Sequence, residues 1–179
     1  MICNISDEIK IENLMRDTEA ISQWERLSGS AEELEAFRYM EKAYSDLGYS
    51  TRLLFHDAYI SLPVNSSFKA DGRLFYSRTH SMSASTGRKA VKGEIVWISE
   101  ERLSLLQPGE LSGKLAAVDG RAVYSSVSWA EKAGALGVIC IQEDPVRECI
   151  PSASWGSPDR RSLNLIPGIP VISVRESEA

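Results

Sequence analysis

The apolar positions in the first third of the chain recur at helical spacing. Residues 11–24 have apolar side chains near one helical face, which predicts an amphipathic helix. A second helix is predicted over residues 31–47, where apolar side chains return every three or four positions. The apolar stripe of the first helix contains Ile11, Leu14, Ile21 and Trp24. That of the second contains Leu34, Phe37, Met40, Tyr44 and Leu47.

Both ends of the second predicted helix carry capping signals. Ser30 and Glu33 form a capping-box pattern, in which each side chain can satisfy the free backbone N–H of the other residue. Gly48 follows where a left-handed C-terminal cap is expected, because glycine adopts a positive φ without steric cost. These signals make residues 31–47 the best-defined helix of the sequence.

The remainder of the chain predicts short extended segments separated by Gly, Pro and Ser. Branched and aromatic residues mark the strands, and turn residues separate them. Residues 77–89 are rich in Ser, Thr, Gly and basic residues, which is typical of a surface loop. The predicted strands are residues 51–62, 74–76, 93–99, 114–119, 137–142 and 169–174.

A third helix is predicted over residues 125–133, between two of these strands. Val127, Ala130 and Ala133 share one stripe of this helix, and Gly134 can end it. The glycines follow the helix, whereas a phosphate-binding loop needs them before a helix N-terminus. They therefore favour close packing of helix against strand over nucleotide binding, and the predicted fold class is α+β.

Composition limits the function classes. The 179 residues are 43% apolar, which is enough for one sizeable core, and carry 25 Asp and Glu against 20 Lys and Arg. A nucleic-acid binder would gather a basic surplus, so we expect neither nucleic acid nor a membrane as a partner. The N-terminus lacks a basic patch followed by an apolar stretch, which favours a cytoplasmic protein, or a secreted or periplasmic one whose leader was removed.

Nucleophilic chemistry finds little support in the sequence. Cys3, Cys140 and Cys149 have neither C-x-x-C spacing nor a nearby His, which favours free or buried thiols, with a Cys140–Cys149 bridge as the alternative. Ser85 and the other serines of its loop lack the G-x-S-x-G context of a serine nucleophile.

Two groups of side chains are candidates for facing a substrate or partner. Arg78, His80 and Arg88 lie in the predicted loop and could meet an anionic group, with a solvated basic loop as the alternative. Trp155, Arg160 and Arg161 could form the rim of a cleft, since Trp and Arg are favoured in interface hot spots. The alternative for Trp155 is packing over the sheet.

The second half of the chain resembles protease-associated domains. Residues 113–119 (GKLAAVD) are similar to the family's "GKIVLVDRG" strand, and residues 128–141 (SWAEKAGALGVICI) to its helix and following strand. Residues 155–158 (WGSP) and 166–174 (IPGIPVISV) are similar to the closing part. The resemblance implies a β-sandwich or open barrel flanked by short helices.

The first half resembles the opening of zinc aminopeptidases of the aminopeptidase Y and glutamate carboxypeptidase type. Residues 24–30 (WERLSGS) and 47–49 (LGY) carry this likeness. In those enzymes a protease-associated domain is inserted before the catalytic core. The resemblance implies an N-terminal helical segment with a strand at residues 1–67 and a protease-associated domain at residues 68–175, with the catalytic zinc domain absent from the chain.

The same resemblance implies a cofactor that this chain does not bind. Such peptidases hold two zinc ions, and their first ligand motif is H-x-D. His56 is followed directly by Asp57, and His80 by Ser81, so neither matches. We therefore expect a chain that is not an enzyme by itself and two zinc ions in the catalytic domain of a parent peptidase.

Three functional hypotheses remain open at this stage. The first is the non-catalytic portion of an aminopeptidase, which shapes access of the peptide substrate or mediates interactions, homodimerisation among them. Residues 77–89 and 145–164 are then the loops expected to face the cleft. The second is a stand-alone module that binds or sorts peptides. The third is a swivelling domain of an unrelated α/β enzyme.

Overall fold

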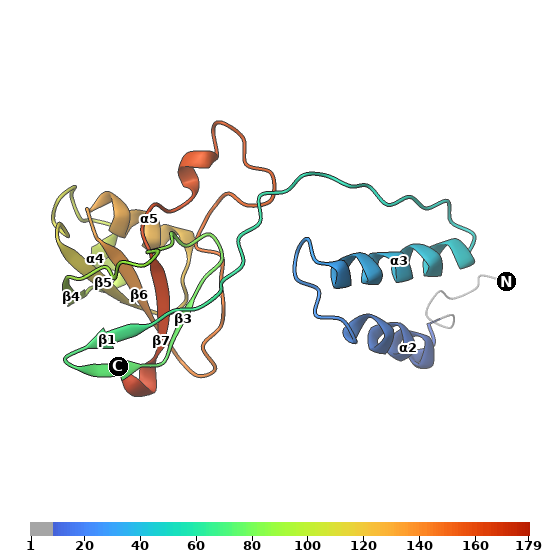
Figure 1. The fold of residues 1–179 in the computed structure, drawn as a ribbon, viewed down its shortest axis with the longest axis horizontal. Coiled ribbons are helices and arrows are strands. Elements are labelled where there is room, and N and C mark those ends of the chain that lie inside the picture. The colour runs from blue at the N-terminus through green and yellow to red at the C-terminus, as the bar shows by residue number, and fades with distance from the viewer. Residues whose placement is uncertain (1–8) are drawn as a thin grey trace. The chain divides into compact units, whose positions relative to one another are not determined.

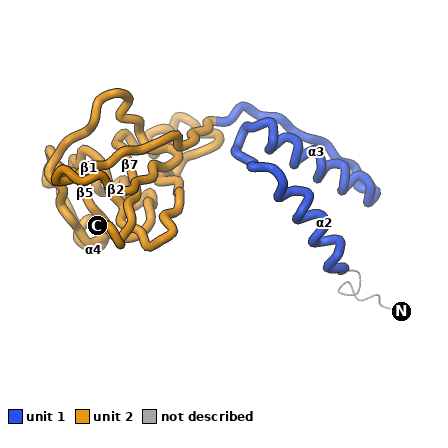
Figure 2. Tube along the Cα trace, turned by 60° about the horizontal axis from the view of Figure 1, so that its bottom comes forward, with its two compact units in different colours: residues 1–58 blue, residues 59–179 orange. Residues whose placement is uncertain are grey.

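The computed structural model describes residues 9–179 and separates the chain into two compact units, Met1–Ala58 and Tyr59–Ala179 (Figure 2). The sequence had indicated a boundary between residues 67 and 68. The segment in between contacts the second unit: Tyr59 forms a backbone bridge with Gly156, and Ser61 Oγ accepts a hydrogen bond from the Met82 N–H at 2.9 Å. Cys3 lies outside the described residues.

The first unit consists of α2 (Ile11–Ser22) and α3 (Ala31–Asp46), joined by a loop over residues 23–30 (Figure 1). Both predicted helices are thus confirmed. The Tyr39 hydroxyl donates to Asp17 Oδ1 at 2.9 Å and links the two helices. No helix within the described part of the chain is long and apolar enough to cross a membrane.

The caps of α3 follow the sequence signals closely. Ser30 Oγ accepts from the Glu33 N–H at 3.0 Å, as the capping box requires. The Glu33 carboxylate reaches Gly29 N–H at 2.7 Å instead of the expected N–H of Ser30. At the other end Gly48 has a φ of +90° and its N–H donates to the Ser45 carbonyl at 2.9 Å.

The second unit is built on a mixed five-stranded sheet of order β3-β7-β6-β5-β4. Four strands are parallel and the edge strand β3 runs antiparallel to β7. Together with the helices this is an α+β fold. The strands are β3 (Ser77–Thr79), β4 (Glu94–Trp97), β5 (Lys114–Asp119), β6 (Gly137–Gln142) and β7 (Val171–Arg175).

One face of the sheet is covered by α4 (Glu100–Leu103) and α5 (Tyr124–Lys132). The predicted small-residue stripe of α5 lies in the main core, where Val127, Ala130 and Ala133 have no exposed surface. Small side chains let the helix approach the branched residues of β5 and β6 closely. Gly134 ends the helix with a φ of +88°, as predicted.

The other face carries a smaller apolar cluster of Ala117, Ile139 and Val174, against which Phe68 packs. Phe68 comes from the two-stranded hairpin of β1 (Phe68–Ala70) and β2 (Arg73–Phe75). Two short 3-10 helices, η1 (Leu163–Leu165) and η2 (Glu176–Glu178), complete the unit.

Two sequence predictions are wrong in this region. Residues 51–62 were predicted to form a strand, but only Tyr59 pairs, in an isolated bridge with Gly156. The apolar and aromatic composition was suited to a strand, but no neighbouring strand supplies a hydrogen-bonding ladder. Residues 77–89 were predicted as a surface loop, yet they begin with β3 at the edge of the sheet.

Candidate functional site

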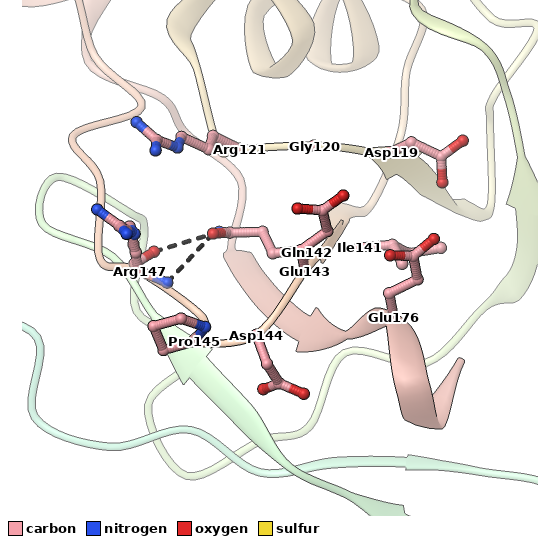
Figure 3. A pocket seen from close by; sticks show the side chains of 10 residues that line it. All are labelled: Asp119, Gly120, Arg121, Ile141, Gln142, Glu143, Asp144, Pro145, Arg147 and Glu176. Carbon is pink, nitrogen blue, oxygen red and sulfur yellow. Dashed lines mark hydrogen bonds between the residues drawn. The ribbon is translucent and has the colours of Figure 1, made fainter.

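A hollow of about 380 Å³ lies where β5, β6 and β7 end (Figure 3). The carboxyl ends of these parallel strands meet at one edge of the sheet, which is where open parallel sheets commonly bind ligands. The lining comes from residues 119–121, 141–145, 147 and 176. All of these lining residues lie in the Tyr59–Ala179 unit.

The floor of the hollow is fixed by the backbone. The Gly120 N–H donates to the Ile141 carbonyl at 2.7 Å and holds the ends of β5 and β6 together. Gly120 has a φ of +95°, which residues with a Cβ rarely adopt. On the other side of this turn, Asp119 Oδ2 accepts a hydrogen bond from Trp97 Nε1 at 3.1 Å.

Gln142 fixes the loop that follows β6. Its side chain is buried, with Oε1 accepting from the Arg147 N–H at 3.1 Å and Nε2 donating to the Arg147 carbonyl at 3.2 Å. The same Nε2 donates to Ser173 Oγ at 2.5 Å. One amide group thus closes the loop of residues 143–147 and joins it to β7.

The buried side chain of His80 hydrogen-bonds to the backbone just beyond the same loop. Its side chain is only 2% exposed, and Nδ1 accepts from the Cys149 N–H at 3.1 Å. Nε2 lies 2.8 Å from Ser173 Oγ, so the neutral ring carries its proton on Nε2 and donates there. Burial lowers the pKa of His80 to about 4, with Arg78 acting in the same direction and Glu148 opposing it.

The charged side chains around the hollow differ in whether they have hydrogen-bond or ion-pair partners. Asp144 is engaged, since Oδ1 lies 3.2 Å from Arg175 Nε and Oδ2 accepts from Ser177 Oγ at 3.2 Å. The charged groups of four other lining residues have no hydrogen-bond or ion-pair partner within residues 9–179. These are Arg121, Glu143, Arg147 and Glu176.

His80 and Cys140 are both buried in unreactive forms. His80 has both ring nitrogens hydrogen-bonded and no surface from which to accept a substrate proton. Cys140 and Cys149 are free thiols, and burial raises the pKa of Cys140 to about 12, far from a nucleophilic thiolate. The described residues contain no group of three or more His, Cys, Asp or Glu placed to hold a metal.

The histidines do not fit the dinuclear zinc site that the family resemblance implies. His56 lies in the extended segment of the helical unit and is exposed. His80 lies in the other unit and uses both nitrogens internally. A zinc ligand needs a free ring nitrogen beside other donors. His80 has no free ring nitrogen, and His56 belongs to no group of three such donors within the described residues.

Of the six candidate contact residues, five are exposed and one is buried. His80 was a candidate for facing a partner, and this is corrected: the ring is buried because β3 carries it under the loop of residues 143–149. Trp155 is 65% exposed and does not pack over the sheet. The remaining candidates Arg78, Arg88, Arg160 and Arg161 are all exposed.

The two loops expected to face a cleft are tied to each other. Glu148 Oε1 accepts from the Ser81 N–H at 3.1 Å and from Ser81 Oγ at 2.6 Å.

The lining residues Arg121, Gln142 and Arg147 were not among the candidates predicted from the sequence. For Arg121 and Gln142 the one local signal was a position just after, or at the end of, a predicted buried strand, and Arg147 had no such signal.

Comparison with solved structures finds the same fold in bacterial aminopeptidases. An aminopeptidase from Aneurinibacillus sp. strain AM-1 matches 94% of this chain with a TM-score of 0.65 and 22% identity. A zinc aminopeptidase from Bacillus subtilis matches 90% with a TM-score of 0.58 and 19% identity. A peptidase precursor from Shewanella amazonensis matches 89% with a TM-score of 0.54 and 16% identity.

This chain spans 39% of the first two of those chains and 40% of the third. The likeness extends over both compact units, since it takes in 94% of the residues at its widest. No protein-family model matches the chain, and no curated protein matches it.

Proposed function

We propose that this chain is the non-catalytic N-terminal and protease-associated portion of a zinc-dependent aminopeptidase, in which it shapes access of peptides to the active site. The observation that carries the proposal is the extent of the structural likeness. Nearly the whole chain, helical unit included, matches an aminopeptidase, while the chain spans only 39% of that protein. The two zinc ions and the catalytic residues would belong to the remaining part of such a protein.

The helical unit supports the proposal because it lacks a core of its own. Within α2 and α3 only Ala36 is buried. Apolar side chains on both helices stay open to solvent, Ile11 at 72% and Tyr44 at 56% among them. Two short helices with such faces require cover, and a catalytic domain packed against them would supply it.

The loops of residues 77–89 and 145–164 are the parts proposed to face the cleft. Hydrogen bonds from Ser81 to Glu148 join the two loops, which supports a shared role. Trp155, Arg160 and Arg161 are all exposed in the second of these loops, and these residue types are common where a protein binds a peptide.

The proposal predicts a selective loss in substrate use. In the full-length protein, the triple variant Trp155→Ala, Arg160→Ala, Arg161→Ala should lower kcat/KM for peptides of several residues by about tenfold, the worth of roughly 1.4 kcal/mol. Hydrolysis of a single aminoacyl chromogenic substrate should change little, since such a substrate is too short to reach the loops. Steady-state kinetics with both substrates measures the difference.

Lys69→Ala is the matched control, because Lys69 is exposed on the hairpin of the same unit and belongs to neither loop. Equal kinetics of the triple variant and the control on long peptides would remove the cleft-facing role. A stand-alone module that binds or sorts peptides is the second candidate. It would bind peptides through this surface without any associated hydrolase activity.

A further inference from the structure

We infer that the hollow at the ends of β5, β6 and β7 binds a small cationic zwitterion, a molecule with one carboxylate and two positively charged nitrogen groups. Free lysine or arginine has this chemistry. The inference goes beyond the proposed function, because it concerns a ligand site at one edge of the sheet and does not involve Trp155, Arg160 or Arg161. Of the charged residues that line the hollow, Arg147 alone lies in the loop of residues 145–164.

Opposite charges are separated across the hollow. Figure 3 shows Arg121 and Arg147 on one side and Asp119 and Glu176 on the other, with Glu143 between them. No ion pair joins the arginines to these carboxylates within the described part of the chain. A ligand with a carboxylate at one end and ammonium groups at the other matches this separation, and guanidinium groups bind carboxylates in a bidentate fashion.

The balance of charge in the hollow determines which net charge the ligand should carry. Asp144 already has Arg175 and Ser177 as partners, which leaves three carboxylates against two guanidinium groups. Asp119 uses only Oδ2, toward Trp97, so its other oxygen remains available. The surplus of negative charge favours a ligand with a net positive charge, which distinguishes lysine from a neutral amino acid.

The charged groups are carried by a rigid frame. The Gly120 N–H to Ile141 carbonyl bond fixes one wall, and the amide of Gln142 holds both the N–H and the carbonyl of Arg147. A ligand therefore does not need to order the backbone of the hollow when it binds. The volume of about 380 Å³ lies at the small end of ligand pockets, which suits a single amino acid.

The test is a titration of the 179-residue chain at low salt and neutral pH, followed by the backbone amide signals of Gly120 and Glu143. The probes are lysine, lysinamide, which lacks the carboxylate, and norleucine, which lacks the side-chain ammonium. Lysine should give saturable shifts with a dissociation constant of about 1 mM, and each of the other two should bind at least about fivefold more weakly.

Paired variants separate the two ends of the ligand. Arg121→Gln with Arg147→Gln should abolish the preference for lysine over lysinamide. Glu143→Gln with Glu176→Gln should abolish the preference for lysine over norleucine. Lys69→Gln with Lys92→Gln removes as much positive charge as the arginine pair, outside the hollow and outside both loops, and should leave lysine binding unchanged.

Equal binding of lysine and lysinamide, or shifts that do not saturate, would overturn the inference. So would a loss of binding in the control pair as large as in the arginine pair, since that would indicate a general charge effect. None of these results depends on peptidase activity, so failure here is separable from failure of the proposed function.

Discussion

Acidification from pH 6.5 to pH 4 is expected to lower the free energy of unfolding of the Tyr59–Ala179 unit by about 3 kcal/mol through His80 alone. The neutral ring is required in the folded state, because Nδ1 accepts the Cys149 N–H. A protonated ring would place two donors against each other and a charge in a buried position. The loop that follows β6 would lose its attachment to β3.

The direction in which pH changes the free energy of unfolding follows from the pKa values of His80 in the unfolded and folded states. In the unfolded chain the ring binds a proton below its ordinary pKa of 6.5, whereas in the folded unit it does so only below about 4. Between these values the unfolded state binds more protons, so protonation favours unfolding. The stabilisation is complete above pH 6.5, declines as the pH falls, and is lost below pH 4.

Urea unfolding at several pH values, followed at amides of β6, measures the effect. His80→Phe keeps a planar ring without a titrating nitrogen and should have a shallower dependence on pH between 6.5 and 4. The chain offers a matched control in His56→Phe, because His56 is exposed and lies in the other unit. Parallel pH profiles of His80→Phe and the unchanged chain would show that His80 does not carry the acid sensitivity.

Gln142→Leu is expected to lower the stability of the same unit by about 2–4 kcal/mol. Leucine has a similar size but removes three hydrogen bonds, two to Arg147 and one to Ser173. The N–H and carbonyl of Arg147 then lose their partners in a partly buried position. Because the loop also lines the hollow, the variant should weaken lysine binding as well.

Gln107→Leu controls for the change of residue type, since Gln107 is exposed in a turn of the same unit. Denaturant unfolding of both variants at neutral pH provides the comparison. A loss in Gln142→Leu no larger than in Gln107→Leu would mean that the clamp around Arg147 contributes little to stability.

The elements that were predictable share a strong local pattern. Residues 114–119 form a largely apolar run between Gly113 and Gly120, and residues 137–142 form another that begins at Gly137. The structure has β5 and β6 over the same residues. The helices α3 and α5 had both a periodic apolar stripe and a stop signal. In these segments the local pattern and the tertiary packing agree.

The elements that were missed depend on partners distant in sequence. β3 has the polar sequence SRT and is a strand because β7 pairs with it. The helix α4 has only four residues, too few to show periodicity. Residues 51–62 had a suitable composition for a strand but no adjacent strand beyond the bridge at Tyr59.

The candidate site was less predictable than the fold for the same reason. Arg121 and Arg147 face one hollow only because β5 and β6 are neighbours, and nothing local in the sequence links them. His80 lay in a polar stretch that reads as a loop, and its burial depends on Cys149 and Ser173. Trp155, by contrast, was proposed from residue type alone and is exposed.

The coding sequence downstream of the codon for Ala179 tests the central claim most directly. If the chain is the accessory portion of a zinc aminopeptidase, the frame continues into a segment with an H-x-D motif and, later, a Glu-Glu pair and a further His as zinc ligands. A stop codon at this point, or a membrane-spanning segment in place of those ligands, would contradict the account and favour a peptide-binding module.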